Sequence, residues 1–100
     1  MTCRYLSYDN GRLFVVDMGL SRIYCLESKK EWGATVLGGH GKDIGMFNKP
    51  AGLVFDELGA MIVVDSGNNR LQVLDNSLNF CGALKVCIEI ILRLVIYWYL

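Results

Sequence analysis

The chain has 100 residues, enough for one small domain with a modest core of its own. Ten basic residues balance ten acidic ones, so the bulk charge favours neither nucleic acid, nor an anionic membrane, nor an acidic substrate. Hydrophobic residues make up 53% of the sequence, and the N-terminal MTCRYLSYDNGR lacks the basic and apolar regions of a signal peptide. Because the four cysteines form no C-x-x-C pair, we expect free thiols and a cytoplasmic location.

Short apolar runs bounded by Gly, Asn, Asp and Pro recur along the chain and predict β-strands. The runs LFVV at 13–16 and MIVV at 61–64 are apolar at successive positions, which is typical of strands buried on both faces. In chain order, strands are expected at 5–8, 13–17, 23–26, 34–37, 51–55, 61–65, 70–74 and 79–84.

The connections between these runs have recognisable turn chemistry. Gly and Asn tolerate positive φ, so 56–59 (DELG) and 66–69 (SGNN) are predicted to be tight turns. Asp17 and Asp65 each end a strand, and each carboxylate is expected to accept hydrogen bonds from the backbone that follows it.

The sequence repeats itself after 48 residues. With that shift, 11–27 aligns with 59–75 without a gap, and seven of the seventeen positions are identical. The identical pairs are Gly11/Gly59, Val15/Val63, Val16/Val64, Asp17/Asp65, Gly19/Gly67, Arg22/Arg70 and Leu26/Leu74. Because turn residues and strand centres are preserved together, we interpret the two halves as copies of one unit.

Antiparallel four-stranded units of this length, each packed between copies of itself, are typical of propeller blades. We therefore predict an all-β fold, a partial β-propeller of about two four-stranded blades. The first blade is expected at 1–37 and the second at 38–84, with an apolar tail outside the repeat at 85–100.

The run from Gly38 to Asp75 resembles an NHL repeat over nearly its full consensus. The resemblance lies in a Gly-rich lead-in followed by F-x-x-P-x-G, D-x-x-G and V-x-D-S-x-N-N-R. These motifs are formed by Phe47, Pro50, Gly52, Asp56, Gly59, Val63, Asp65, Ser66, Asn68, Asn69 and Arg70.

Residues 4–37 resemble the last three strands of a preceding repeat, with Met18, Leu20 and Ser21 in place of the Ser, Asn and Asn. The resemblance implies a propeller, usually of six blades, and is greatest to the branch that follows a RING, B-box and coiled coil in TRIM proteins. Such propellers recruit protein substrates or bind RNA.

The C-terminal sequence KVCIEIILRLVIYWYL departs from the repeat pattern. Two blades cannot close a ring, so further blades from this or another chain are expected to be needed. We interpret the chain as a fragment, a truncated isoform or an incomplete gene model. The tail is too short and too charged to span a bilayer, and interfacial membrane association is the lesser alternative to translated sequence unrelated to the propeller.

The sequence predicts no catalytic, cofactor or metal site. GGHGKDIG at 38–45 lacks the Walker A spacing, and His40 has no spaced Cys or Asp partners, so we interpret this segment as an inter-blade turn. Cys25 is expected to be a core residue. Structural roles in the repeat are assigned to Asp17, Gly19, Arg22, Pro50, Gly52, Gly59, Asp65, Gly67, Asn69 and Arg70.

Three functions follow from the resemblance and the residues. The first is a non-catalytic scaffold that binds a protein partner, with ubiquitin ligation requiring a RING that this sequence does not contain. The second is an RNA-binding face, for which the candidate contacts are Lys29, Lys30, Lys42 and Lys49, with Arg22 and Arg70. The third is an enzyme with metal ligands in the propeller channel, which the scarcity of clustered His, Asp and Glu disfavours.

Overall fold

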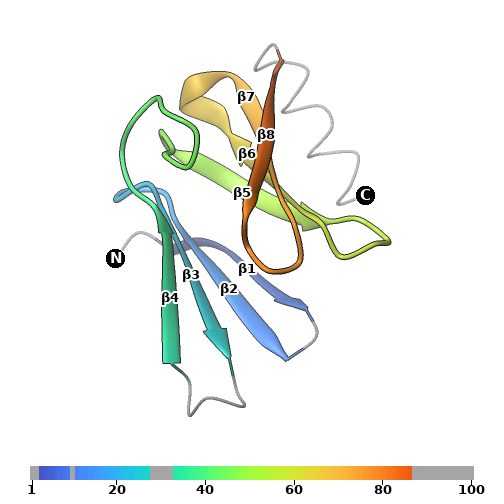
Figure 1. The fold of residues 1–100 in the computed structure, drawn as a ribbon. Helices are drawn as coiled ribbons and strands as arrows, with labels where there is room; N and C mark the ends of the chain where they lie inside the picture. The colour runs from blue at the N-terminus through green and yellow to red at the C-terminus, as the bar shows by residue number, and fades with distance from the viewer. Residues whose placement is uncertain (1–2, 10, 28–32, 87–100) are drawn as a thin grey trace, which may run out of the picture.

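The computed structural model describes residues 3–9, 11–27 and 33–86, and in residues 3–9 it describes the backbone alone. These residues form eight strands in two antiparallel sheets, in the orders β1-β2-β3-β4 and β5-β6-β7-β8. The first sheet comprises β1 (Cys3–Asp9), β2 (Arg12–Asp17), β3 (Arg22–Glu27) and β4 (Gly33–Gly38). The second comprises β5 (Pro50–Phe55), β6 (Met61–Asp65), β7 (Arg70–Leu74) and β8 (Phe80–Lys85), with the 3-10 turn η2 (Ser66–Asn68) between β6 and β7. Figure 1 shows the two sheets side by side.

The eight strands lie where the apolar runs predict them, within two residues at each end. The register also repeats, since Asp17 lies opposite Arg22 in the first sheet and Asp65 lies opposite Arg70 in the second. Each sheet has an irregularity near the start of its first strand, between Cys3 and Tyr5 and between Pro50 and Gly52. The 48-residue period of the sequence is therefore a period of the structure.

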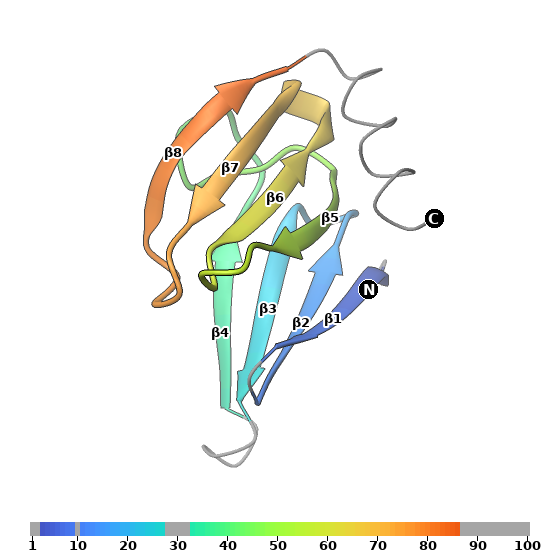
Figure 2. The same cartoon turned by 90° about the vertical axis from the view of Figure 1, so that its right-hand side faces the viewer.

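The core lies between the two sheets (Figure 2). The first sheet contributes Phe14, Val16, Ile23, Cys25 and Leu37, and the second contributes Leu53, Met61, Val63 and Leu74. The rings of Phe14 and Phe55 meet across the interface with their centroids 5.3 Å apart. The inner strands β2 and β6 are the most buried, which confirms the prediction made from their unbroken apolar runs.

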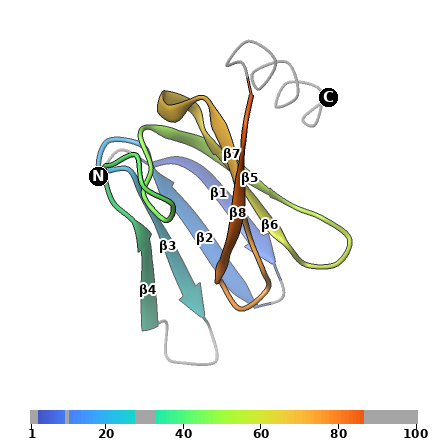
Figure 3. The same cartoon turned by 45° about the horizontal axis from the view of Figure 1, so that its top comes forward.

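A connecting loop, residues 39–49, links β4 to β5 and confirms the interpretation of the Gly-rich segment as a link between blades (Figure 3). Phe47 of this loop is fully buried, and the centroid of its ring lies 6.0 Å from that of the Phe80 ring. Cys25 is buried, as expected for a core residue. Trp32 lies outside the described residues.

The described arrangement is all-β and open, with two sheets that do not close into a ring. This confirms the prediction of a partial propeller. The predicted tail lies outside the described residues from position 87 onward. Among the residues that the structure describes, no helix has the length and apolar character needed to cross a membrane.

Candidate functional site

The turn after β6 packs directly against the connecting loop. Gly67 donates its N–H to the Asn48 carbonyl at 2.7 Å, and a Cβ on Gly67 would lie 2.5 Å from that same oxygen. Only glycine permits this approach, which explains the glycine of the SGNN motif. Asn69 closes the turn in the left-handed region, with φ of 52°. The side chains that begin and follow this turn are thereby directed at the loop.

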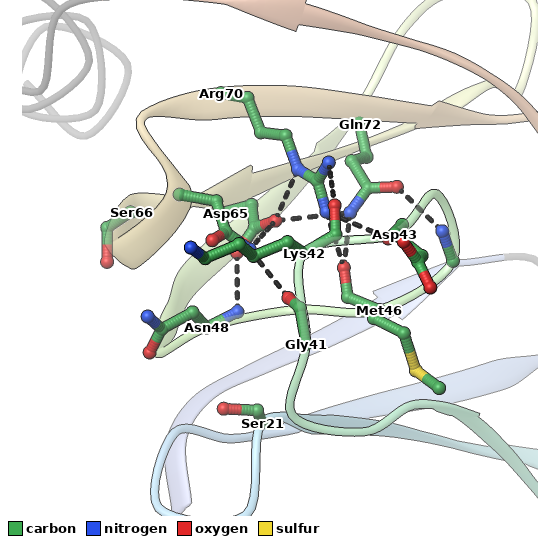
Figure 4. A network of polar contacts seen from close by, with 12 residues as sticks. Ser21, Gly41, Lys42, Asp43, Met46, Asn48, Asp65, Ser66, Arg70 and Gln72 are labelled. Carbon is green, nitrogen blue, oxygen red and sulfur yellow. Dashed lines mark hydrogen bonds and ion pairs between the residues drawn. The ribbon is translucent and has the colours of Figure 1, made fainter.

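Asp65 is fully buried at the end of β6, and its carboxylate accepts four hydrogen bonds (Figure 4). Oδ1 accepts from the Asn48 backbone N–H at 2.7 Å. Oδ2 accepts from Arg70 Nε at 2.7 Å, Asn68 Nδ2 at 3.0 Å and Gln72 Nε2 at 3.1 Å. The protein itself therefore supplies four donors to this buried carboxylate, one to Oδ1 and three to Oδ2.

The partners of Asp65 correct one prediction. The sequence suggests that Asp65 binds the backbone beyond it, but its side chain makes no capping bond to the η2 turn. It accepts instead from Asn48, seventeen residues earlier in the chain. The physical reason is that the loop packs beside the end of β6 and brings the Asn48 N–H, which would otherwise be unpaired, to the buried carboxylate. Tertiary packing creates this contact, so the local sequence does not predict it.

Arg70 binds the loop through its carbonyl groups. Nη1 donates to the Lys42 carbonyl at 2.7 Å, and Nη2 donates to those of Asp43 and Met46 at 3.0 and 2.9 Å. Arg70 is buried, and Nε completes the ion pair with Asp65. Because the guanidinium donates to three backbone carbonyls and one carboxylate, four of its five N–H donors are engaged within the protein.

Both the nitrogen and the oxygen of the Gln72 side-chain amide bind the same loop. Nε2 donates to the Met46 carbonyl at 2.6 Å, and Oε1 accepts from the Gly45 N–H at 3.1 Å. Asn68 adds a bond from Nδ2 to the Gly41 carbonyl at 2.9 Å. We call Asp65, Asn68, Arg70 and Gln72 the anchoring cluster, because together they bind the backbone of the loop from Gly41 to Asn48.

The comparison with known families agrees with this geometry. Residues 47–74 match the family model of the NHL repeat. An NHL repeat is present in this chain. The matched range contains all four residues of the anchoring cluster, together with Asn48, and the match confirms an NHL repeat at these residues. A search of curated proteins gives no match to the chain. NHL repeats are protein-interaction modules, and the propellers that they build are generally non-catalytic scaffolds.

The turn between β2 and β3 is the counterpart, one 48-residue period earlier, of the turn between β6 and β7. Asp17 is buried and accepts from the Leu20 N–H at 3.2 Å, which confirms the predicted bond to the following backbone. Arg22, the counterpart of Arg70, is exposed. Ser21 takes the place of Asn69 and adopts the same left-handed conformation, with φ of 55°. Its hydroxyl accepts from the Lys49 N–H at 3.1 Å, so this turn supports the far end of the connecting loop.

The other residues to which the sequence assigns a structural role or an RNA contact lie in strands, in turns or on the exposed loop. Pro50 and Gly52 are buried in β5, and Gly59 has φ of 87° in the β5–β6 turn, as a predicted tight turn requires. Gly19 is exposed in the β2–β3 turn. Lys42 and Lys49 are exposed on the connecting loop, while Lys29 and Lys30 lie outside the described residues.

Sequence reasoning missed Gln72 and Asn48 as parts of the network. Gln72 carried a usable signal, since it is the polar centre of the strand RLQVL and a buried amide requires partners. Asn48 contributes through its backbone, which any residue except proline could supply, so its identity carries no such signal.

The turn and the loop also form a pocket. A cavity of about 270 Å³ is lined by Lys42, Gly67, Asn68, Asn69, Arg70 and Lys85. The two lysines are exposed, whereas the Arg70 guanidinium is engaged by the loop. Within residues 3–9, 11–27 and 33–86, no three His, Cys, Asp or Glu side chains gather as metal ligands.

Proposed function

We propose that this chain is a non-catalytic scaffold, part of an NHL propeller that recruits a protein substrate to a TRIM-type ubiquitin ligase in the cytoplasm. The observation that carries the proposal is the anchored loop between the sheets. Ile44 and Met46 are 56% and 39% exposed on that loop. Apolar side chains displayed on a fixed backbone suit recognition of a protein surface, because little conformational entropy is lost when they are buried.

The anchoring cluster supports a scaffold over an enzyme. General acid–base catalysis needs a carboxylate with an acceptor position open to substrate. Asp65 is fully buried, and four donors of the protein already surround its oxygens. We assign the cluster to the fixing of the loop, and we assign the TRIM branch on the resemblance of the sequence.

The scaffold proposal is tested by proximity labelling in cells with three forms of the chain: wild type, the double variant Ile44→Asp/Met46→Asp, and Leu58→Asp as control. Leu58 is 90% exposed on the β5–β6 turn, away from the loop. Proteins labelled by the wild type and the control should be lost with the double variant, and purified examples should bind the wild-type chain directly. An identical set of labelled proteins for all three forms would contradict the proposal.

A second candidate function, an RNA-binding face, is favoured by the pocket between Lys42 and Lys85. The net positive charge beside this pocket is small, because the charge of Arg70 is offset by its ion pair with Asp65. Recognition of single-stranded RNA also needs exposed aromatic planes, and Phe14 and Phe47 are fully buried. We therefore expect RNA binding to be weak and independent of sequence.

Titration with labelled single-stranded RNA at two salt concentrations tests this alternative. Two phosphate contacts from the lysines give a slope of about −1.4 in log K against log[salt]. Lys42→Ala/Lys85→Ala should abolish what binding there is. Tight binding that depends on RNA sequence at physiological salt would overturn the scaffold proposal in favour of RNA recognition.

A further inference from the structure

The pocket between the β6–β7 turn and the connecting loop is lined by two lysines that lie far apart in the sequence. Lys42 belongs to the connecting loop, and Lys85 ends β8. Both are exposed, and neither has an ion-pair partner among the described residues. The other lining residues are Gly67, Asn68, Asn69 and Arg70. Because none of the six is acidic, the walls of the pocket hold no carboxylate that neutralises the two lysines.

Hydrogen bonds fix the backbone that carries each lysine. The Lys42 carbonyl accepts from Arg70 Nη1 at 2.7 Å (Figure 4). The Val86 N–H donates to the Asn69 carbonyl at 2.9 Å, which holds the end of β8, and Lys85 with it, beside the turn. A site whose backbone is already fixed loses little conformational entropy when a ligand binds.

Arg70 adds a donor to the wall of the pocket. Four of its five N–H groups donate to the Asp65 carboxylate and to carbonyls of the loop. The fifth, the second N–H of Nη1, has no acceptor in the described part of the chain, although only 6% of Arg70 is exposed. Buried donors normally have a partner, so an oxygen atom of a ligand at this wall would supply one that the protein does not.

The charge and the size of the pocket fit a phosphate monoester. A phosphoserine or phosphothreonine carries a charge of about −1.5 to −2 at pH 7, which matches two lysines better than a single carboxylate does. The volume of about 270 Å³ is many times the roughly 10–15 Å³ that admits one water molecule. The pocket therefore has room for a phosphate group together with the side chain that carries it.

We propose that this pocket binds a phosphorylated serine or threonine of the protein partner, an inference that rests on the scaffold function proposed above. Lys42 and Lys85 donate to the phosphate oxygens, and the remaining N–H of Arg70 adds a third donor. Ile44 and Met46 follow Lys42 on the same loop and are exposed. The partner segment therefore presents apolar side chains beside its phosphate.

The surroundings of the pocket favour a phosphorylated protein over RNA. An RNA strand has a phosphate at every nucleotide, and its binding calls for a basic groove that follows the backbone. The loop beside the pocket carries instead the exposed acidic Asp43 and the apolar Ile44 and Met46. A protein segment with one phosphorylated residue suits this surface better.

The test measures binding of the full chain to an array of peptides, each with one central phosphoserine between randomised positions. The same peptides with unmodified serine are the reference. Lys42→Met/Lys85→Met removes both charges from the pocket and keeps two long, flexible side chains. Lys49→Met is the matched control, because Lys49 is exposed on the same loop and does not line the pocket.

The wild type and the control should bind a subset of the phosphopeptides about tenfold or more tightly than the serine forms. The double variant should lose this preference, with an unchanged far-ultraviolet circular dichroism spectrum because both lysines are exposed. Equal binding of phosphorylated and unmodified peptides by the wild type would overturn the proposal. So would an equal loss of the preference in Lys49→Met.

Two further measurements separate this proposal from the functions considered above. Single-stranded RNA that displaces the tightest phosphopeptide at a lower concentration than the free phosphopeptide itself would assign the pocket to nucleic acid. Phosphatase treatment of the proximity-labelled proteins should weaken their binding to the wild-type chain. If they bind unchanged after this treatment and still fail to bind Ile44→Asp/Met46→Asp, the phosphate pocket is wrong and the scaffold function stands.

Discussion

The Phe47 ring lies so close to the Gly38 backbone that a Cβ on Gly38 would be 2.3 Å from the ring carbon Cδ2. Gly38 also has φ of 87°, a conformation that residues with a side chain rarely adopt. Phe47 is fully buried, and the centroid of its ring lies 6.0 Å from that of Phe80 in the second sheet. The last residue of the first sheet and the aromatic residue of the loop therefore determine together how closely the two sheets approach.

Gly38→Ala is expected to destabilise the chain. The substitution adds backbone strain to overpacking, and each costs about 1–3 kcal/mol. Urea unfolding at one fixed chain concentration measures the loss. Gly82→Ala is the matched control, because a Cβ there meets no atom within 4 Å. Equal stabilities for the two variants would show that the close approach of Phe47 to Gly38 does not limit the fold.

Arg70→Ala is expected to be far more costly than Arg22→Ala, although the two residues occupy the same place in the repeat. Removing Arg70 takes the opposite charge away from the buried Asp65 carboxylate and takes one donor from each of three loop carbonyls, and breaking a buried pair costs about 3–5 kcal/mol. Arg22 is exposed, and its removal should change stability by less than about 0.5 kcal/mol. Thermal unfolding of both variants under one set of conditions gives the comparison.

The contrast between Arg22 and Arg70 also shows how far the sequence could predict this structure. Strand positions and turns were predictable, because apolar runs and Gly or Asn signals are local. The two arginines look equivalent in sequence, and their difference arises from the loop, which packs on Arg70 and not on Arg22. The direction in which Asp65 binds was missed for the same reason, since its partner at Asn48 is brought near by tertiary packing.

Asp65→Asn is expected to loosen the connecting loop, although the two side chains have nearly the same shape. The amide oxygen can still accept from the Asn48 N–H, but an NH₂ group in place of Oδ2 cannot accept from Arg70, Asn68 or Gln72. Loss of a charged hydrogen bond costs about 1.5–3 kcal/mol. Hydrogen exchange should increase at the Gly45 and Phe47 amides ahead of global unfolding. If loop exchange stayed at the wild-type rate, the anchoring role of Asp65 would be wrong.

Asp75 is expected to give the β7–β8 turn a pH dependence in the acidic range. Its Oδ1 accepts from the backbone N–H groups of Asn79 and Ser77, both at 2.9 Å, and its Oδ2 accepts from Asn79 Nδ2 at 3.2 Å. The Asn79 backbone N–H is the main cause that lowers the pKa of Asp75 below 3.8, with the Asn79 side chain second. The unfolded chain therefore binds this proton more readily than the folded chain does.

The sign of the effect follows from that difference. Stability from Asp75 is fully present above its unfolded pKa, near 3.8, and is lost as the pH falls through the lower folded pKa. The ¹³C shift of the carboxyl group, followed by NMR against pH, should give a midpoint below 3.8. Asn79→Ala retains the backbone donor and removes only the amide side chain, so it should raise the midpoint part of the way towards 3.8. A wild-type midpoint at or above 3.8 would mean that the Asn79 and Ser77 hydrogen bonds do not favour the ionised carboxylate in solution.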